Sequence, residues 1–507
     1  MNTISTKRVY FVAVVSLVLG ILFDYLFYDK QIGISFLIYE VLLLAGLFCF
    51  LFAFKIRPDK AVFLFLPAIL FFALMVGIRD NIFLLFWNVV MTIGLMLLMA
   101  HQIIGRKINQ ILFLDYLKTA VIVPFSMLGK SIGALGRIIA VGKGNKENQK
   151  TSQIAKGILI TLPIALAFLF LLTSADLVFK KLLTNLFSFN FSINPDVVAQ
   201  IWWAAFFAFL WLGVYIYILE NAGQPKNSEP DLLNRIYKFG NIEAGILFTT
   251  LNVLFLSFVI IQIKYLFAGH GAITQFGYTY AEYAHKGFGE LIAVAVVTFA
   301  LVFLAEKHIE RSENKPNRLF KILTCILMLL VIVIMASAFT RLGIYEQAYG
   351  FTLLRLLVQA FIIWLAVVFL WLTYKIIRNT KDRPFIFGIF LSVVTFFVVF
   401  NLFNPDAFVA KKNINQFVKT GALDTKYLST LSADVVPDLM PLLAMPQIQD
   451  KYGNQLAIEI AFILKNFYDL SAKQPWQSYN LSRIRAIELI NSQWGLISTL
   501  AQKKLIN

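Results

Sequence analysis

The stretch Arg341-Leu-Gly-Ile-Tyr-Glu-Gln-Ala-Tyr-Gly-Phe-Thr-Leu-Leu-Arg355 lies between two long apolar runs, Ile322–Phe339 and Leu356–Tyr374. It carries two arginines, a glutamate and two tyrosines, whereas the flanking chain has almost no charge. An ionisable side chain at the edge of a hydrocarbon layer is costly unless it is paired or hydrated. The stretch therefore predicts either an anchor in the headgroup region or one wall of a polar pocket between two membrane-spanning helices.

The composition of the whole chain also indicates a bilayer protein. Of 507 residues, 59% are hydrophobic and 14% are charged, whereas a soluble domain has about 25% charged residues. The net charge of +17 is typical of a membrane protein with Lys and Arg in cytoplasmic loops, near anionic phospholipid. Because the sequence contains no arginine-rich or aromatic-interleaved soluble domain, we expect no nucleic-acid partner.

Apolar runs that approach the roughly 20 residues needed to cross a bilayer recur along the chain. They predict an all-α polytopic transmembrane helical bundle of about eleven spans. The first run follows Lys7-Arg8 without a small-residue cleavage site, so we interpret it as an uncleaved span. The predicted spans are Val9–Phe27, Ile32–Phe54, Ala61–Ile78, Ile82–Ile104, Ile154–Thr173, Val197–Leu219, Ala244–Phe267, Phe288–Leu304, Ile322–Phe339, Leu356–Tyr374 and Phe385–Phe403.

Charge in the segments between these runs predicts the orientation. With the N-terminus inside, five of the six inside segments carry a clear surplus of Lys and Arg, and the outside segments are close to neutral. This pattern follows the positive-inside rule. It predicts a multi-pass protein of the cytoplasmic membrane with a cytoplasmic N-terminus. An odd number of spans then places the C-terminus outside the cytoplasm.

Four regions follow from these runs. Residues 1–104 hold spans one to four, and residues 154–403 hold spans five to eleven. Residues 105–153 are interrupted by charge and predict a basic amphipathic cytoplasmic segment on the anionic inner leaflet, or else a linker against the bundle. Residues 404–507 predict a small helical extracytoplasmic domain, with apolar residues at helical spacing in Leu456–Leu470 and Ile484–Leu500. We interpret its aspartates as helix caps and solvated residues, namely Asp406, Asp424, Asp434 and Asp438.

Several stretches of the second half of the chain match one family pattern. They are Tyr278–Leu291, the residues Arg341, Tyr345, Ala348-Tyr349-Gly350 and Arg355, the segment Asn404-Pro-Asp406, Asn413, and Asp424–Asp434. Together they resemble a family of multi-spanning bacterial membrane proteins catalogued as a domain of unknown function (DUF4153 or DUF4173 type). The resemblance implies a bacterial polytopic membrane protein and implies no activity.

The candidate site combines two polar stretches that this topology places on the outer side. If the segment from Ala281 is helical, Glu282 and Glu290 share a face at the start of the eighth span. Arg341, Tyr345 and Arg355 share another face if Gly343 and Gly350 do not break the helix. The arginine fork suits an anionic headgroup or phosphate. The predicted ligand or ion-pair pocket consists of Glu282, Glu290, Arg341, Tyr345, Glu346 and Arg355.

Three functions remain open for this constellation. It could hold a ligand in transport or lipid handling through an outward-facing polar pocket, or lock the spans together as an ion-pair network. Alternatively, the protein is an accessory or sensory envelope protein whose C-terminal domain contacts a partner protein. The sequence leaves open whether it is an enzyme and leans against it. It shows no nucleophile–base pair and no metal-ligand spacing, so we expect no catalytic residue, metal or cofactor.

Overall fold

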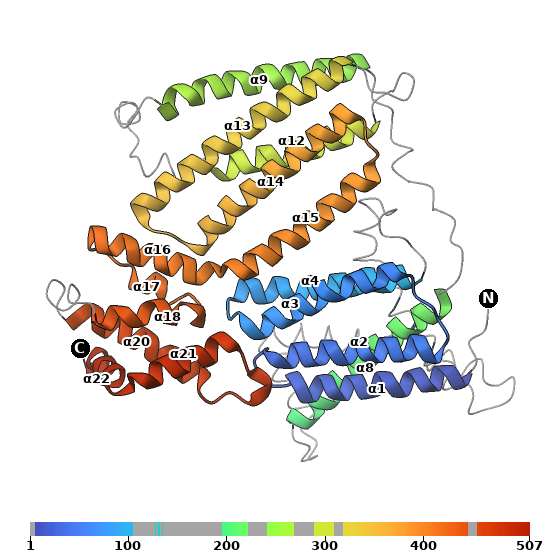
Figure 1. The fold of residues 1–507 in the computed structure, drawn as a ribbon, viewed down its shortest axis with the longest axis vertical. Helices are drawn as coiled ribbons and strands as arrows, with labels where there is room; N and C mark the ends of the chain where they lie inside the picture. The colour runs from blue at the N-terminus through green and yellow to red at the C-terminus, as the bar shows by residue number, and fades with distance from the viewer. Residues whose placement is uncertain are drawn as a thin grey trace, which may run out of the picture. The chain divides into compact units, whose positions relative to one another are not determined.

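A computed structural model describes residues 6–104, 127, 130, 131, 134, 195–221, 241–267, 288–308, 318–444 and 454–506 (Figure 1). All regular secondary structure in these residues is helical. The predicted all-α class is therefore confirmed. The fifth predicted span, Ile154–Thr173, and most of the segment 105–153 lie outside the described residues.

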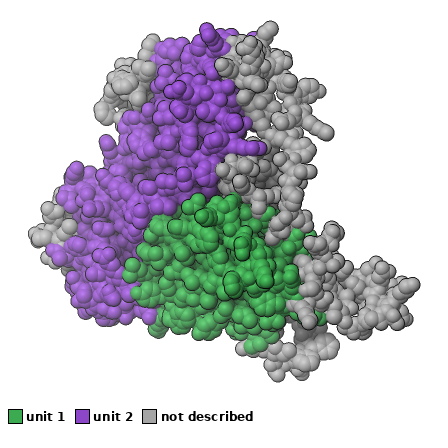
Figure 2. Space-filling view, turned by 45° about the vertical axis from the view of Figure 1, so that its right-hand side comes forward, with its two compact units in different colours: residues 1–78, 86–226, 473–481 green, residues 79–85, 227–472, 482–507 purple. Residues whose placement is uncertain are grey.

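The chain divides into two compact units (Figure 2). Unit 1 comprises residues 1–78, 86–226 and 473–481, and unit 2 comprises residues 79–85, 227–472 and 482–507. Each unit thus collects segments that are distant in the sequence. The short loop that follows residue 78 belongs to unit 2, although the helices on either side of it belong mainly to unit 1.

Unit 1 is a set of apolar helices. They are α1 (Thr6–Phe27), α2 (Ile34–Ala53), the 3-10 turn η1 (Lys60–Phe65) with α3 (Leu66–Ile78), most of α4 (Ile82–Ile103), and α8 (Pro195–Asn221). α1 packs along α8, and α2 packs against α3. Gly20 of α1 faces the backbone of Ala204 and Ala208. Small residues at such a contact let two helix backbones approach closely, as is common between membrane helices.

The long apolar helices of unit 2 are α9 (Asn241–Phe267), α12 (Phe288–His308), α13 (Arg318–Tyr349), α14 (Leu353–Arg378) and α15 (Asp382–Phe403). α13 contacts α9, α12 and α14, and α14 also packs on α15. Near the end of α14, the buried Lys375 forms ion pairs with Glu306 of α12 and, at 2.8 Å, with Asp382 of α15. This triad satisfies a cation that would otherwise be costly in an apolar setting.

Eight of the described helices are long and apolar enough to cross a membrane. They are Arg8–Phe27, Ile34–Ala53, Lys60–Ile78, Ile82–Ile103, Ala199–Glu220, Arg318–Gln347, Leu353–Arg378 and Asp382–Phe403. Two shorter apolar helical segments, Ala244–Ile260 and Leu291–Glu306, lie at two further predicted runs. Large apolar side chains such as Phe52 and Ile82 are 88% and 81% exposed. Such exposure suits lipid, whereas water would disfavour it.

The described residues after Asn404 are helical, and most of their buried apolar side chains share one core. The longer helices of this tail are α16 (Pro405–Thr420), α20 (Asn454–Ser471), α21 (Leu481–Ser492) and α22 (Trp494–Ile506). Its short elements are α17 (Thr425–Leu428), η4 (Ala433–Val435), α18 (Val436–Leu439), η5 (Met440–Ala444) and η6 (Trp476–Ser478). Buried apolar residues of α16, α18, α20, α21 and α22 form one cluster, and Phe351 and Leu356 pack against it. The connection between α13 and α14 is therefore joined to the tail core.

Candidate functional site at the α13–α14 junction

The α13–α14 junction, residues 341–359 with the tail residues that contact them, forms a helical hairpin. α13 continues through Arg341 and Gly343 and ends at Tyr349. Gly350 has φ +80°, a backbone conformation that residues with a side chain rarely adopt. α14 then starts behind Thr352, whose side chain accepts a hydrogen bond from the Arg355 backbone N–H at 3.4 Å. The helix breaks at Gly350, so the condition under which Arg341 and Arg355 would share one helical face is not met.

The tail holds this hairpin through hydrogen bonds to its backbone. The Phe351 N–H donates to Asn413 Oδ1 at 2.7 Å, and Asn413 Nδ2 donates back to the Phe351 carbonyl at 2.8 Å. The Leu353 N–H donates to the Tyr427 hydroxyl at 2.6 Å, and Gln416 Nε2 donates to the Gln347 carbonyl at 2.8 Å. Because these partners come from α16 and α17, the geometry of the hairpin depends on the tail.

Within the hairpin, one arginine and one glutamate are placed close together. The Arg355 guanidinium lies 4.2 Å from the centroid of the Tyr345 ring and donates to the Gly350 carbonyl. Glu346 is 2% exposed, and its Oε2 accepts a hydrogen bond from Gln359 Nε2 at 2.7 Å. Glu346 Oε1 is buried without a hydrogen-bond partner. Arg355 and the exposed Lys412 of α16 act on Glu346 as nearby positive charges.

The structure brings together three of the six residues of the predicted pocket. Tyr345, Glu346 and Arg355 come together across the hairpin, and Arg341 is a half-buried residue of α13. Glu290 lies in the first turn of α12, but its side chain and the whole of Glu282 lie outside the described residues. The convergence of these two glutamates with the arginines therefore stays a prediction.

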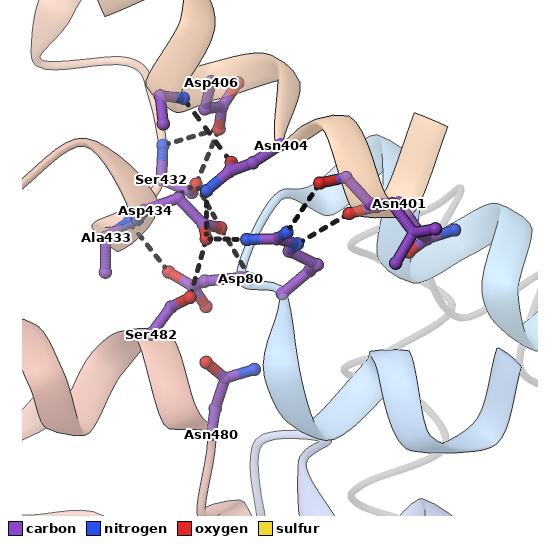
Figure 3. Close-up of polar contacts among 12 residues, drawn as sticks. Asp80, Asn401, Asn404, Asp406, Ser432, Ala433, Asp434, Asn480 and Ser482 are labelled. Carbon is purple, nitrogen blue, oxygen red and sulfur yellow. Dashed lines mark hydrogen bonds and ion pairs between the residues drawn. The ribbon is translucent and has the colours of Figure 1, made fainter. Parts of the chain in front are cut away.

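Sequence reasoning missed a second polar cluster in unit 2, which we call the Asp434 network (Figure 3). The Asp434 residue is 5% exposed, and its carboxylate accepts hydrogen bonds from four different segments. Its donors are Arg79 Nη1 at 3.4 Å, Ser482 Oγ at 2.6 Å, Asn404 Nδ2 at 3.3 Å, the Asp80 N–H at 2.9 Å and Ser432 Oγ at 3.1 Å. One carboxylate thus links the loop after residue 78, the start of α16, the loop before η4 and α21.

Arg79 and Asp80 of this network also have several hydrogen-bond partners. Arg79 also donates to the carbonyls of Asn401 and Leu402 at 2.8 and 3.3 Å. These carbonyls are at the end of α15, where helix carbonyls lack partners within the helix. Asp80 accepts from the Ala433 N–H at 3.1 Å and from Arg483 Nε at 2.5 Å.

Burial raises the pKa values of two acids of the Asp434 network. It raises the pKa of Asp80, and the nearby Arg483 partly opposes this rise. It likewise raises the pKa of Asp406, which is opposed by hydrogen bonds from Ser432 N–H and Oγ at 3.0 and 2.6 Å. The interpretation of Asp406 and Asp434 as solvated residues is therefore wrong. The expected cap is present at Asp424, which accepts from the Tyr427 N–H at 2.8 Å.

These observations define the class of the protein, a polytopic α-helical membrane protein whose bundle is joined to a helical tail. Residues 65–442 match the family described as "Domain of unknown function (DUF4153)". This match covers 378 of 507 residues (442 − 65 + 1), so the chain belongs to this family and the resemblance found in the sequence is confirmed. No curated protein and no solved structure matches the chain.

Proposed function

We propose that this membrane protein handles an anionic amphiphile, in lipid handling or transport, at the α13–α14 junction. The observation that carries the proposal is the state of Arg355. Its guanidinium is held by the Tyr345 ring and the Gly350 carbonyl. Arginine has five N–H donors in a planar fork that matches phosphate and carboxylate. Among the described residues, one of these donors is engaged, so the fork is held in place with donors left for a ligand.

The charge balance of the junction supports an anionic ligand. Two cations of the junction, Arg355 and Lys412, act on its one described buried acid, Glu346. An anionic headgroup that enters the junction would meet a surplus of positive charge beside an apolar helix surface. Electrostatic attraction of this kind acts together with burial of an apolar chain when a protein binds a charged lipid.

The position of the junction along α14 supports a site at the bilayer edge. Arg355 and Lys375 are 20 residues apart on this helix (375 − 355), which corresponds to about 30 Å. That length is close to the thickness of the hydrocarbon core. The surplus of Lys and Arg in the predicted inside segments supports a cytoplasmic membrane location with the junction facing outward.

The proposal is tested by lipid binding in nanodiscs. Fluorescent phosphatidylglycerol is titrated against the full chain, with phosphatidylcholine and inorganic phosphate as separate arms. Arg355→Gln should weaken binding of phosphatidylglycerol about tenfold or more, because a hydrogen bond to a charged group contributes about 1.5–3 kcal/mol. Lys419→Gln, on the exposed last turn of α16, is the matched control and should leave binding unchanged.

Each arm of this test has a defined outcome. Preference for phosphatidylglycerol that is lost in Arg355→Gln supports lipid handling. If inorganic phosphate competes equally well, the site binds free anions rather than lipid. Equal binding of the anionic and zwitterionic lipids, or an unchanged affinity in Arg355→Gln, would contradict the proposed role of the junction.

A second candidate function has its own supporting observation. The tail contacts the hairpin directly through Asn413 and Tyr427, so a protein bound to the tail could alter the hairpin, as expected of an accessory or sensory envelope protein. A photo-crosslinking residue at the exposed Leu470 of α20 tests this. A crosslinked envelope protein that is lost when the crosslinker is moved to the buried Ile460 supports it. Crosslinks to lipid alone would exclude this role for the surface around Leu470.

A further inference from the structure

A second candidate site lies in unit 1 and is independent of the junction. A partly open cavity of about 800 Å³ is lined by residues of α1, α2, α4 and α8, a size typical of small-molecule sites. Asp24, Tyr28, Asp29 and Lys30 line it near the end of α1 and the loop that follows. Further along the helices, the lining becomes apolar, with residues such as Leu43, Leu47, Met96, Leu97 and Ala100.

Aromatic side chains form much of the wall of this cavity. Phe23, Tyr39, Trp203, Phe207 and Trp211 all line it. The Tyr39 hydroxyl accepts a hydrogen bond from Trp211 Nε1 at 2.8 Å and donates to the Leu19 carbonyl at 3.2 Å. The polar groups of Tyr39 and Trp211 are therefore satisfied within the protein and do not need a hydrogen bond from a ligand.

One carboxylate in the cavity differs from these satisfied groups. Glu40 of α2 is 3% exposed, and its Oε1 has no hydrogen-bond partner. In the part of the chain that the structure describes, no Lys or Arg forms an ion pair with it. A buried carboxylate is strongly unfavourable unless it is paired, hydrogen-bonded or protonated.

Acidic residues outnumber basic ones in the described lining of the cavity. Its described lining residues include three acids, Asp24, Asp29 and Glu40, and one cation, Lys30. Lys30 donates to the Tyr25 carbonyl at 2.7 Å and lies 5.6 Å from the centroid of the Tyr25 ring. The Oδ1 atom of Asp24 is buried without a hydrogen-bond partner, like Oε1 of Glu40. The cavity is thus an apolar, aromatic space in which a buried carboxyl group, Glu40, has no cationic partner among the described residues.

We infer that this cavity binds a lipophilic cation, a molecule with one positive charge on an apolar body. The charge lies at Glu40, and the aromatic rings stabilise it through cation–π contacts. Glu40 is six residues past Ile34, the first residue of α2 (40 − 34), about 9 Å along the helix. Leu47 lies about 10 Å further along, so the apolar body has room beyond the charge.

A pair of probes with the same shape and opposite charge tests this inference. Tritiated tetraphenylphosphonium and tetraphenylborate are measured on nanodiscs that hold the full chain, and empty nanodiscs give the background. The phosphonium should bind above background, and the borate should not. Glu40→Gln should weaken phosphonium binding at least about tenfold, because a charge-assisted contact with Glu40 is lost.

Two further variants keep the test decisive. Asp59→Asn is the matched control, because Asp59 is an exposed cap of η1 outside the cavity and Asn retains the cap. It should bind the phosphonium as the wild type does. Leu97→Trp keeps Glu40 and places a bulky ring in the apolar part of the cavity, so it should also weaken binding. Equal binding of both probes by the wild type, or phosphonium binding that survives both cavity substitutions, would overturn the inference.

Discussion

The Asp434 network and the α13–α14 junction are both polar clusters of unit 2, and they differ in how completely their charges are matched. Asp434 accepts hydrogen bonds from five donors, and Asp80 is paired with Arg483. At the junction, Glu346 Oε1 has no partner and Arg355 uses one donor among the described residues. Oδ1 of Asp406, at the edge of the Asp434 network, also lacks a hydrogen-bond partner, so the difference between the clusters lies in Asp434 and Arg355 themselves. A carboxylate with several donors fixes a structure, whereas a guanidinium with donors left over has capacity for a ligand.

The largest loss of stability is expected when Asp434 is removed from the Asp434 network. Asp434→Ala should lower the free energy of unfolding by about 3–5 kcal/mol, because removing one partner leaves buried charges uncompensated. Thermal unfolding in detergent, followed by size-exclusion chromatography, measures the loss. Asp469→Ala removes an exposed carboxylate paired with Lys465 and should cost at most about 1 kcal/mol. Equal losses in the two variants would contradict the structural role of Asp434.

A smaller effect is expected from the turn that shapes the junction. Gly350 has φ +80°, and an added Cβ would lie 2.9 Å from Asn413 Oδ1. Gly350→Ala should therefore cost about 1–3 kcal/mol of stability. Gly343→Ala is the matched control, because Gly343 is helical and no neighbouring atom lies within 4 Å of its Cβ position. Alanine favours a helix there, so this control should be neutral or stabilising. The reverse order would show that the hairpin turn is misplaced.

The buried acids of the Asp434 network predict that the stability of the protein depends modestly on pH. Burial raises the pKa of Asp406, so the folded state holds this proton at a pH where the unfolded state has released it. Stability therefore falls as the pH rises through the raised pKa, and it is regained as the pH is lowered. The Asp406→Asn variant lacks this group and should show a flatter dependence of the unfolding midpoint on pH in the range above the ordinary pKa of an aspartate.

The control for this pH effect is Asp424→Asn. Asp424 is exposed and caps α17, and Asn retains the cap, so the slope of the wild type should persist. If Asp406→Asn and Asp424→Asn give the same slope as the wild type, Asp406 does not titrate in this range.

The smallest effect on stability is expected at the α13–α14 junction. Lys412 is exposed, and its ammonium lies 5.9 and 5.4 Å from the Phe351 and Phe408 ring centroids. Lys412→Gln should lower stability by at most about 1 kcal/mol, because exposed cation–π contacts are weak. It should still reduce binding of phosphatidylglycerol. A large loss of stability together with unchanged lipid binding would assign Lys412 to the structure instead.

Within the described residues, the hydrophobic runs predicted where the long apolar helices lie, because length and low charge decide whether a helix can cross a bilayer. They did not predict the ends of the helices. The run Ile322–Phe339 stops at polar residues, but α13 continues to Tyr349. Backbone hydrogen bonds are indifferent to polarity, and it is Gly350 that ends the helix. The hairpin that brings Arg355 over Tyr345 follows from this break.

The Asp434 network could not be predicted from local spacing. Arg79 and Asp434 are 355 residues apart, and Asp80 and Arg483 are 403 apart. Each of these residues alone resembles a solvated loop residue or a helix cap, as Asp424 is. Only the packing of the tail on the end of α15 brings them together. The tyrosine and arginines of the junction were found because charge between two apolar runs is itself an unusual pattern.

The central claim is that Arg355 serves an anionic ligand rather than the stability of the hairpin. The most direct measurement is the unfolding midpoint of the wild type and of Arg355→Gln in nanodiscs, as phosphatidylglycerol replaces phosphatidylcholine. We predict that phosphatidylglycerol raises the midpoint of the wild type, because a ligand that binds only the folded state stabilises it. The midpoint of Arg355→Gln should not respond. An equal rise in both proteins, or no rise in either, would contradict the claim.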